Sequence, residues 1–414
     1  CRMGQNSGTK KTTFIKSFRR RRLSSMTNSI SAVGQYSWVF LMVNSRQLYW
    51  LKIKASLYTL FYIMLVTTSC GVLASEISIA RIGPPLEHPW GLTSLDSQRV
   101  LVTTRPGSLY LINTSTQISK KIINTPNVVE YRQGGLLDVA SQKVGNETVV
   151  FLCYSKPVSS SESSTAVFRA ILDSDRLVNG SDIFVSNKPS RSGVHFGCRL
   201  AIKDNILYAS VGDRGERNNA QNPRNHSGTI IHISLPPAKT PRSLNKNWAK
   251  EIYSIGHRNP QGLVFNDRTG ELWSHEHGPR GGDEINIISY GNNYGWPKVS
   301  YGKEYIGGDI GLNYSPKGFT DPVWKWTPSI APSGMAFYYG NMFPELRGKL
   351  LIGSLKFMRL FVVNMGKNGY PTSETSILKN VVGRVRDVEV LKDGSILILN
   401  DEQDGGLFRI SRVK

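Results

Sequence analysis

Two short segments concentrate the residue types that do chemistry: residues 256–262 (GHRNPQG) and residues 275–286 (HEHGPRGGDEIN). Arg258 and Asn259 offer planar donors of fixed geometry, which suit carboxylates and carbonyls. A solvated turn with incidental charges is the alternative interpretation. The density of histidines, arginines and carboxylates in these segments favours a binding site.

The elements around these segments are predicted to be strands. Residues 262–265 (GLVF) and 270–273 (GELW) flank an NDRTG turn, so the two polar segments lie at strand ends, where a rigid scaffold presents functional groups. Gly278 and Pro279 leave backbone carbonyls free there. Carbonyl oxygen is a ligand that a hard cation such as calcium accepts, so these two residues are candidate metal ligands.

A second chemical candidate is His195, in the segment 193–197 (GVHFG). The ordinary pKa of histidine suits proton abstraction near neutral pH. A single histidine is more often structural, and Asp213 within residues 212–215 (GDRG) reads from its own surroundings as a turn residue. The sequence around these residues alone does not assign them a role.

From residue 77 onward the pattern is one of short apolar strands separated by polar turns. No helix-period segment competes with it. The repeated unit is a strand, a turn with Asp, Asn or Gly, and a Gly-x-Leu strand; the strands are residues 99–104, 109–112, 205–211, 228–233, 348–353, 359–363, 394–399 and 406–410. About 335 residues of such units divide into about six four-stranded blades of roughly 55 residues. An array of β-sandwiches is the alternative.

The net charge of +21 first points to a nucleic acid or a membrane surface. Residues 1–75 carry eleven Lys and Arg and no Asp or Glu, so the remaining residues carry only +10. The remainder has no interleaving of basic and aromatic residues of a nucleic-acid motif, and we expect no nucleic-acid partner.

Three segments are predicted along the chain. Residues 1–42 are predicted to be a disordered basic extension, translated from upstream of the true start. The alternative is a basic arm that binds anionic partners. Residues 43–75 fit a secretory signal, because a basic stretch precedes the apolar run 57–66. That run is too short for an integral membrane span. Residues 76–414 are predicted to be one domain that is exported to the periplasm; a lipid anchor on Cys70 is the alternative location.

Four cysteines do not make a disulfide framework. Cys1 and Cys70 lie in the leader, and the spacing of Cys153 and Cys198 has no zinc pattern. A disulfide between Cys153 and Cys198 is one possibility; two buried thiols are the state that we expect.

Taken together, the motifs resemble the soluble quinoprotein sugar dehydrogenases, which use pyrroloquinoline quinone (PQQ) and comprise soluble glucose dehydrogenase and the aldose sugar dehydrogenases. The resemblance covers roughly residues 78 to 412 in the family's order. It rests on GHRNPQG, EHGPRGGDEIN and YGNNYGWP and on the segments QGGLLD (133–138), HFGCRL (195–200), VGDRG (211–215), LK (355–356) and RVRD (384–387). The resemblance implies an all-β six-bladed β-propeller with four-stranded antiparallel blades, whose loops converge on one site.

The resemblance also implies roles for the reacting groups. His195 matches the general base that removes the proton from the anomeric hydroxyl of the sugar, while a hydride passes to the quinone. Asp213 matches the carboxylate that orients this base. Arg258 matches the arginine at the reactive quinone carbonyl, where its charge stabilises oxyanion character. Gln133 matches a residue on the substrate side.

Cofactor contacts follow in the same way. PQQ is a tricarboxylate, which several fixed cations would bind. Asn259, Lys356, Arg384 and Arg386 match its ligands, although the spacing of Arg384 and Arg386 also fits an exposed strand face. Gly278 and Pro279 match the carbonyl ligands of a calcium ion that would polarise the quinone oxygens.

Some residues depart from the glucose enzyme. His277 replaces a glutamine and Val194 an aspartate, and the segment between the His195 motif and GHRNPQG is shorter. These departures favour the aldose branch, with a more open site and a monomer. The expected function is oxidation of aldoses at C1 to lactones. The chain has no Cys-x-x-Cys-His haem motif, so electrons would leave on a separate acceptor.

Two functions from other classes stay open. The first is a propeller that binds carbohydrate or protein without redox chemistry, and a base together with four cofactor cations argues against it. The second is a calcium-dependent lactonase, which would need several carboxylate ligands, whereas the matched metal loop supplies carbonyls.

Overall fold

The computed structural model describes residues 76–237 and 246–413. The chain divides into the units Cys1–Val72 and Leu73–Lys414, and only the second contains described residues. The predicted extension (1–42) and signal segment (43–75) therefore lie outside the described residues. Within the described ranges, no helix is long and apolar enough to cross a membrane.

Six four-stranded antiparallel sheets make up the described unit, as the strand pattern and the resemblance predict. Five sheets each use four consecutive strands: β2 (Pro89–Ser94), β3 (Arg99–Thr104), β4 (Leu109–Asn113) and β5 (Ser119–Ile122); β6 (Leu136–Val144), β7 (Glu147–Pro157), β8 (Ser163–Asp173) and β9 (Arg176–Val185); β10 (Gly197–Lys203), β11 (Ile206–Val211), β12 (Thr229–Ser234) and β13 (Ile252–Ile255); β14 (Pro260–Phe265), β15 (Leu272–Glu276), β16 (Asp283–Ile288) and β17 (Trp324–Trp326); β18 (Pro332–Tyr338), β19 (Lys349–Ser354), β20 (Arg359–Met365) and β21 (Pro371–Ile377).

The sixth sheet joins the two ends of the described unit. It contains β22 (Val385–Val390), β23 (Ile396–Asn400) and β24 (Gly405–Arg412), with β1 (Ile77–Leu86) paired antiparallel to β24. Because β1 completes this blade, the ring of sheets is closed by hydrogen bonds. The described elements also include two short 3-10 helices, η1 (Arg217–Gln221) and η2 (Pro344–Leu346).

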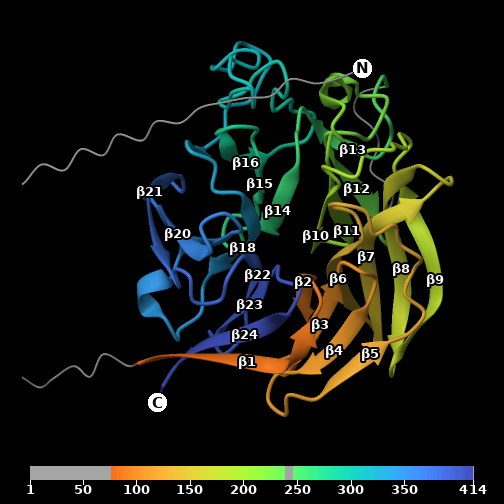
Figure 1. Ribbon diagram of the computed structural model, residues 1–414, viewed down its shortest axis with the longest axis vertical. Helices are drawn as coiled ribbons and strands as arrows, with labels where there is room; N and C mark the ends of the chain where they lie inside the picture. The colour runs from red at the N-terminus through yellow and green to blue at the C-terminus, as the bar shows by residue number, and fades with distance from the viewer. Residues whose placement is uncertain (1–75, 238–245, 414) are drawn as a thin grey trace, which may run out of the picture. The chain divides into compact units, whose positions relative to one another are not determined.

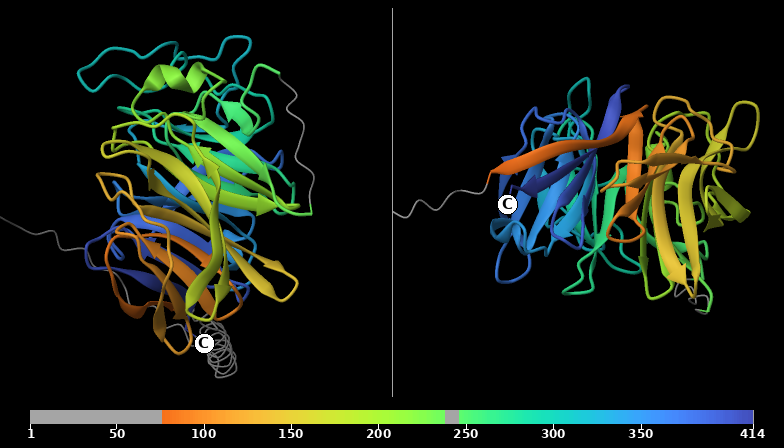
Figure 2. Two further views of the ribbon diagram at one scale, coloured as in Figure 1. Left: turned by 90° about the vertical axis from the view of Figure 1, so that its right-hand side faces the viewer. Right: turned by 90° about the horizontal axis from the view of Figure 1, so that it is seen from below.

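The first strand lies innermost in five blades, and β22 does so in the sixth. Each of these six strands packs against the next around the ring, and the last returns to the first: β2, β6, β10, β14, β18, β22. Figure 1 shows these strands around the centre, with β5, β9 and β21 at the periphery. Figure 2 shows the sheets edge-on, with loops at both ends of the strands. The loops that precede the inner strands are thus brought to one place. Together these features establish a six-bladed β-propeller.

Burial explains why the middle strands are apolar throughout. Each blade is covered by a neighbour on both faces, so strands such as β3 and β23 lose the alternation of a half-exposed strand. Val100, Leu101 and Val102 are all fully buried in β3. The hairpin between β10 and β11 turns on Asp204 and Asn205, which both have positive φ, as a tight two-residue β-turn requires.

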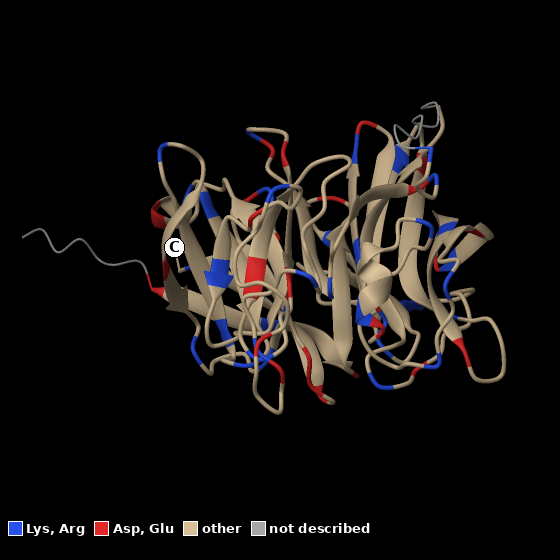
Figure 3. Cartoon of the chain, turned by 90° about the horizontal axis from the view of Figure 1, so that it is seen from above, with Lys and Arg blue, Asp and Glu red and all other residues tan. Residues whose placement is uncertain are grey.

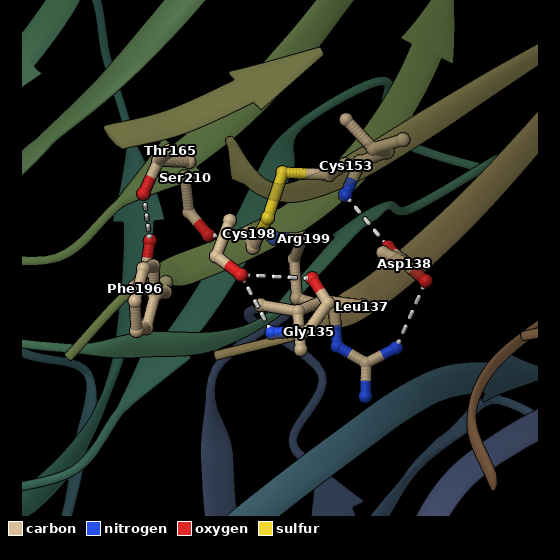
Figure 4. The surroundings of a disulfide bond; sticks show 12 residues. Gly135, Leu137, Asp138, Cys153, Thr165, Phe196, Cys198, Arg199 and Ser210 are labelled. Carbon is tan, nitrogen blue, oxygen red and sulfur yellow. Dashed lines mark hydrogen bonds and ion pairs between the residues drawn. A yellow bond between two sulfur atoms is a disulfide. The ribbon is translucent and has the colours of Figure 1, made fainter. Parts of the chain in front are cut away.

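The expectation of two free thiols in the propeller is wrong. Cys153 in β7 and Cys198 in β10 form a disulfide, and their Cα atoms are 5.5 Å apart. The two residues are 45 positions apart in the sequence, and their proximity arises only because β7 and β10 of neighbouring blades lie side by side. Figure 4 shows the bond crossing between the blades beside Phe196 and Arg199.

Charged residues are dispersed over the described surface. Figure 3 shows Lys and Arg interspersed with Asp and Glu along the strands and loops.

Candidate functional site

His195 lies in the loop that leads into the inner strand β10. Its Nδ1 is 2.7 Å from Oδ1 of Asp213, which follows β11 of the same blade. The backbone of His195 has a φ of 52°, a strained conformation for a residue with a side chain. Gln133 holds this backbone in place, because its Oε1 accepts a 2.7 Å hydrogen bond from the His195 amide.

Asp213 is almost fully buried and is held from three sides. Besides His195, its oxygens accept hydrogen bonds from the Gly215 amide at 2.7 Å and from Nε1 of Trp296 at 2.8 Å. Burial raises the pKa of this carboxyl, but the hydrogen bond and charge of His195 and the Gly215 amide outweigh burial and lower it below the ordinary value. Asp213 is therefore a fixed carboxylate. It holds the proton of His195 on Nδ1 and leaves Nε2 as an acceptor.

Arg258 lies in the loop between β13 and β14, next to this pair. Its carbonyl accepts a 2.8 Å hydrogen bond from the Asp213 amide. Its guanidinium donates from Nη1 to the carbonyls of His277 and Gly278, each at 3.0 Å, and lies 5.4 Å from the Trp296 ring. Backbone and side chain together fix a cation beside the His195–Asp213 pair.

A pocket of about 460 Å³ opens where the inner strands begin. Five of the predicted site residues line it, and they come from distant parts of the sequence: Gln133, Asn259, Lys356, Arg384 and Arg386. Phe196 and Gly197, which directly follow His195, also line it. Gly278 and Pro279 are not among its lining residues.

The lining of the pocket is strongly cationic. Four cations, Arg105, Lys356, Arg384 and Arg386, face one carboxylate, Asp401, among its described lining residues. Asp401 accepts from Nη2 of Arg386 at 2.9 Å, and Arg386 also donates to Gln261 at 3.2 Å. Burial raises the pKa of Asp401, but the Arg386 guanidinium more than offsets this and holds it well below its usual range. One carboxylate does not balance four cations, so the pocket fits an anion with several carboxylates, as PQQ has.

The predicted calcium ligands present a different arrangement. The Gly278 carbonyl accepts a hydrogen bond from the Arg258 guanidinium, a cation that competes with a metal ion. The carboxylate of Asp283, which binds the Gly278 amide, is committed to the backbone amides of Gly278, Ile330 and Ala331 at 2.7–2.8 Å. In residues 76–237 and 246–413, no three His, Cys, Asp or Glu side chains are grouped to hold a metal. The predicted ligands are backbone carbonyls rather than side chains, so Gly278 and Pro279 stay predictions from the resemblance.

Arg105, Asp401 and Trp296 are among the residues of the site that were not predicted. Arg105 lies in a turn of the first blade, Asp401 follows β23, and Trp296 stands in the YGNNYGWP segment that entered only as part of the resemblance. Polar turn residues such as Arg105 and Asp401 occur throughout the chain, so nothing local to them signals the pocket. Trp296 carried a detectable signal, since a Trp in a glycine-rich polar loop is uncommon on a surface.

His277, noted as a departure, also lines the pocket. Its Nε2 lies 2.6 Å from the Pro332 carbonyl and must therefore carry a proton that it donates. Burial lowers the pKa of His277 to about 4, so the ring is neutral at pH 7 and adds no charge to the four cations.

Comparison with known proteins identifies the family. The family model described as glucose / sorbosone dehydrogenase matches residues 86–409. The chain belongs to this family. The matched range contains every predicted site residue, from Gln133 to Arg386, and membership makes the chain an oxidoreductase of the glucose and aldose sugar dehydrogenase group.

Relatives of the glucose / sorbosone dehydrogenase family agree over most of the chain. Aldose sugar dehydrogenase YliI of Escherichia coli is 33% identical over 364 residues, 85% of this chain and 98% of that protein. The crystal structure of the soluble aldose sugar dehydrogenase from Escherichia coli, in its apo-form, superposes with a TM-score of 0.76 at 32% identity, covering 82% of this chain and all of that one. Quinoprotein glucose dehydrogenase B of Acinetobacter calcoaceticus is 27% identical over 265 residues, 56% of this chain and 54% of that protein.

Proposed function

We propose that the chain is a PQQ-dependent aldose dehydrogenase that oxidises sugars at C1 to lactones. The observation that carries the proposal is a pocket with four cations against one carboxylate, whose lining includes Phe196 and Gly197, directly after the half-buried His195 that pairs with Asp213. The names of the aldose sugar dehydrogenase and quinoprotein relatives support the reaction class and the cofactor.

The residues divide the binding of the cofactor among them. Lys356, Arg384 and Arg386 would hold the carboxylates of PQQ, with Asn259 contacting the ring system. Arg105 adds a fourth cation that the sequence did not predict. Bound PQQ would supply an electrophilic quinone that accepts a hydride, that is, two electrons and one proton, from C1 of the sugar.

His195 would act as the general base of this reaction. Its Nε2 takes the proton of the C1 hydroxyl as the C1–H bond breaks, so the sugar loses a proton and a hydride and becomes a lactone. Asp213 keeps the Nδ1 proton in place and stabilises the imidazolium that forms. Arg258 would stabilise negative charge on the oxygen that is being reduced.

The first test is PQQ binding followed by activity. The purified chain is titrated with PQQ, with and without Ca²⁺, while the PQQ absorption spectrum is recorded, and dye reduction is then measured with a panel of aldoses. We expect saturable binding and aldose-dependent dye reduction. Comparison of the two Ca²⁺ conditions tests calcium separately from PQQ.

His195→Ala tests the base. It is expected to bind PQQ as the unchanged chain does and to lose activity by about 10²–10⁴-fold, because the base contributes only to the chemical step. Absence of any spectral change with the unchanged chain would reject the dehydrogenase and leave a propeller that binds carbohydrate or protein. Full activity of the variant would reject His195 as the base.

We also propose that the enzyme is exported to the periplasm, with residues 43–75 as its signal, acts as a monomer and passes electrons to a separate acceptor. The N-terminal sequence of the mature protein from a secreting host tests the first part. Cleavage before Glu76 is expected, whereas a lipid-modified Cys70 at the N-terminus would establish the anchored alternative.

A further inference from the structure

A chain of three buried side chains lies behind the loop that carries Arg258 and Asn259. Oγ of Ser254, on β13, is 2.9 Å from Nε2 of His257, and Nδ1 of His257 is 2.9 Å from Oε1 of Glu276 at the end of β15. A carboxylate only accepts, so Nδ1 carries the proton of the imidazole. In the neutral imidazole, Nε2 then accepts the hydroxyl proton of Ser254.

This Ser–His–Glu arrangement is that of a hydrolase triad, but its burial excludes that role. Ser254 and His257 are 0% exposed and Glu276 is 4% exposed, so no substrate reaches the hydroxyl. The His257 ring also stacks on Tyr294 at 4.8 Å, which covers one of its faces. The three polar groups therefore serve something inside the protein.

Glu276 links this chain to the candidate site. Its second oxygen, Oε2, accepts hydrogen bonds from the backbone amides of both Arg258 and Asn259, the latter at 3.3 Å. One carboxylate thus receives three donors: His257 through one oxygen and two consecutive amides through the other. Two amides aimed at one oxygen fix the peptide planes from which the side chains of Arg258 and Asn259 project.

The same loop is tied to the His–Asp pair from its other side. The Arg258 carbonyl accepts from the Asp213 amide at 2.8 Å, and the Asn259 Oδ1 accepts from the Gly197 amide at 3.2 Å. Any movement of the peptide that Glu276 holds is transmitted to both neighbours. The buried chain is consequently placed to set the relative positions of Arg258 and the base.

We propose that Ser254, His257 and Glu276 are positioning residues that fix the backbone of Arg258 and Asn259 for contact with the cofactor. This inference rests on the proposed function for its catalytic consequence. Its structural part concerns the loop alone. In this assignment none of the three touches the cofactor or substrate, and each acts through the two amides that Glu276 binds.

Hydrogen exchange of the cofactor-free full chain tests the structural part. Ser254→Ala removes the donor to Nε2 of His257 and is expected to raise the exchange rate of the amides in residues 257–259 about tenfold, as the loss of one buried hydrogen bond allows. Ser274→Ala is the matched control. Ser274 is a buried serine of β15 whose hydroxyl donates to the Gly262 carbonyl at 2.9 Å. It takes no part in the hydrogen bonds among Ser254, His257 and Glu276. The Ser274→Ala variant should leave the hydrogen-exchange rates of the amides in residues 257–259 unchanged.

PQQ titration and steady-state kinetics test the functional part. Ser254→Ala should weaken PQQ binding several-fold. Glu276→Gln replaces one accepting oxygen by an NH₂ group that faces other donors, and it should weaken PQQ binding by about 100-fold or more. Both variants should have a nearly unchanged KM for the sugar. Ser274→Ala should lose about as much thermal stability as Ser254→Ala but should bind PQQ with the affinity of the unchanged protein. Equal effects of Ser254→Ala and Ser274→Ala on exchange and on PQQ affinity would overturn the inference.

The two proposals fail in distinguishable ways. If the unchanged chain does not bind PQQ, the proposed function is wrong, and the exchange experiment still decides whether the buried chain holds the loop. If PQQ binds and supports activity but exchange at 257–259 does not respond to Ser254→Ala, the positioning inference alone is wrong.

Discussion

The inner strands of the propeller carry arginines in two settings that differ in how their charge is balanced. In the pocket, four cations face Asp401. Further along the same strands, a second cavity of about 260 Å³ is lined by Arg199 together with three carboxylates. There Arg199 lies 2.9 Å from Asp387 and 3.3 Å from Asp138.

Trp90 separates the two settings. Its ring lies 4.3 Å from the Arg199 guanidinium and 5.3 Å from that of Arg386. Arg199 also donates to the carbonyls of Gln261 and Arg386, so its donors are used within the protein. The comparison teaches that a buried arginine whose charge is balanced by neighbouring carboxylates is part of the framework. An excess of cations over carboxylates around a pocket is the signature of an anionic ligand.

Arg199→Met should have the largest effect on stability, because it removes the cation of the second cavity. It leaves Asp138 and Asp387 as buried carboxylates without their cation, and we expect the free energy of unfolding to fall by about 3–5 kcal/mol. Chemical denaturation of the purified variant measures this. A loss below about 1 kcal/mol would show that Arg199 is not a framework residue.

The disulfide joins β7 to β10, the strand that carries Arg199 and follows His195. Replacing Cys153 and Cys198 together by alanine should lower the free energy of unfolding by about 2–4 kcal/mol, since the unfolded chain regains the freedom of a long loop. The unchanged chain treated with a reductant should approach the same value. A double variant as stable as the unchanged chain would contradict this expectation.

Lys356→Ala sharpens the contrast from the pocket side. Removing one exposed cation should weaken PQQ binding about tenfold while leaving the unfolding temperature nearly unchanged, because this cation serves the ligand rather than the fold. Lys392→Ala, at an exposed lysine away from the pocket lining, is the control and should bind PQQ normally. A loss of affinity shared by both variants would point to a general effect of charge.

The last expected effect, a change of stability with pH, lies at Glu389 in the second cavity. Burial raises its pKa to about 7, although hydrogen bonds from Ser94 oppose the change. The unfolded chain has an ordinary glutamate pKa of about 4.3, so between these values the native state binds more protons and its stability falls as pH rises. Glu389→Gln should remove about 1–2 kcal/mol of that decline between pH 5 and 8.

Denaturation curves at several pH values measure the Glu389 effect. Glu147→Gln, at an exposed residue, is the control and should keep the slope of the unchanged chain. A slope that survives Glu389→Gln would assign the pH dependence to other buried carboxyls.

The fold was predictable because its repeating signals are local. The turn at Asp204 and Asn205 and the apolar strands around it form where the sequence places them. Their number sets the number of blades, and the resemblance supplied the convergence of Gln133, Asn259 and Lys356 on one pocket. Local patterns and motif order were sufficient for these features.

Features that depend on contacts between blades were not predictable. The pairing of Cys153 with Cys198 requires β7 to lie beside β10, which no spacing reveals. His257 and Glu276 looked like part of a polar surface loop, yet both turn inward. Whether a polar side chain faces solvent or a buried partner depends on the neighbouring strands, so composition alone did not show that His257 lies inside the protein.

The pairing of β1 with β24 has a consequence for the order of events as the chain is made. The strand synthesised first among those described, Ile77–Leu86, must wait for Gly405–Arg412 before its blade exists. The closing contacts therefore join strands from opposite ends of the described residues, and such non-local contacts form slowly. Earlier blades can form during synthesis, but the ring is completed only after β24 has emerged. A chain passed through a membrane before that moment would still be open, and closure would take place on the far side.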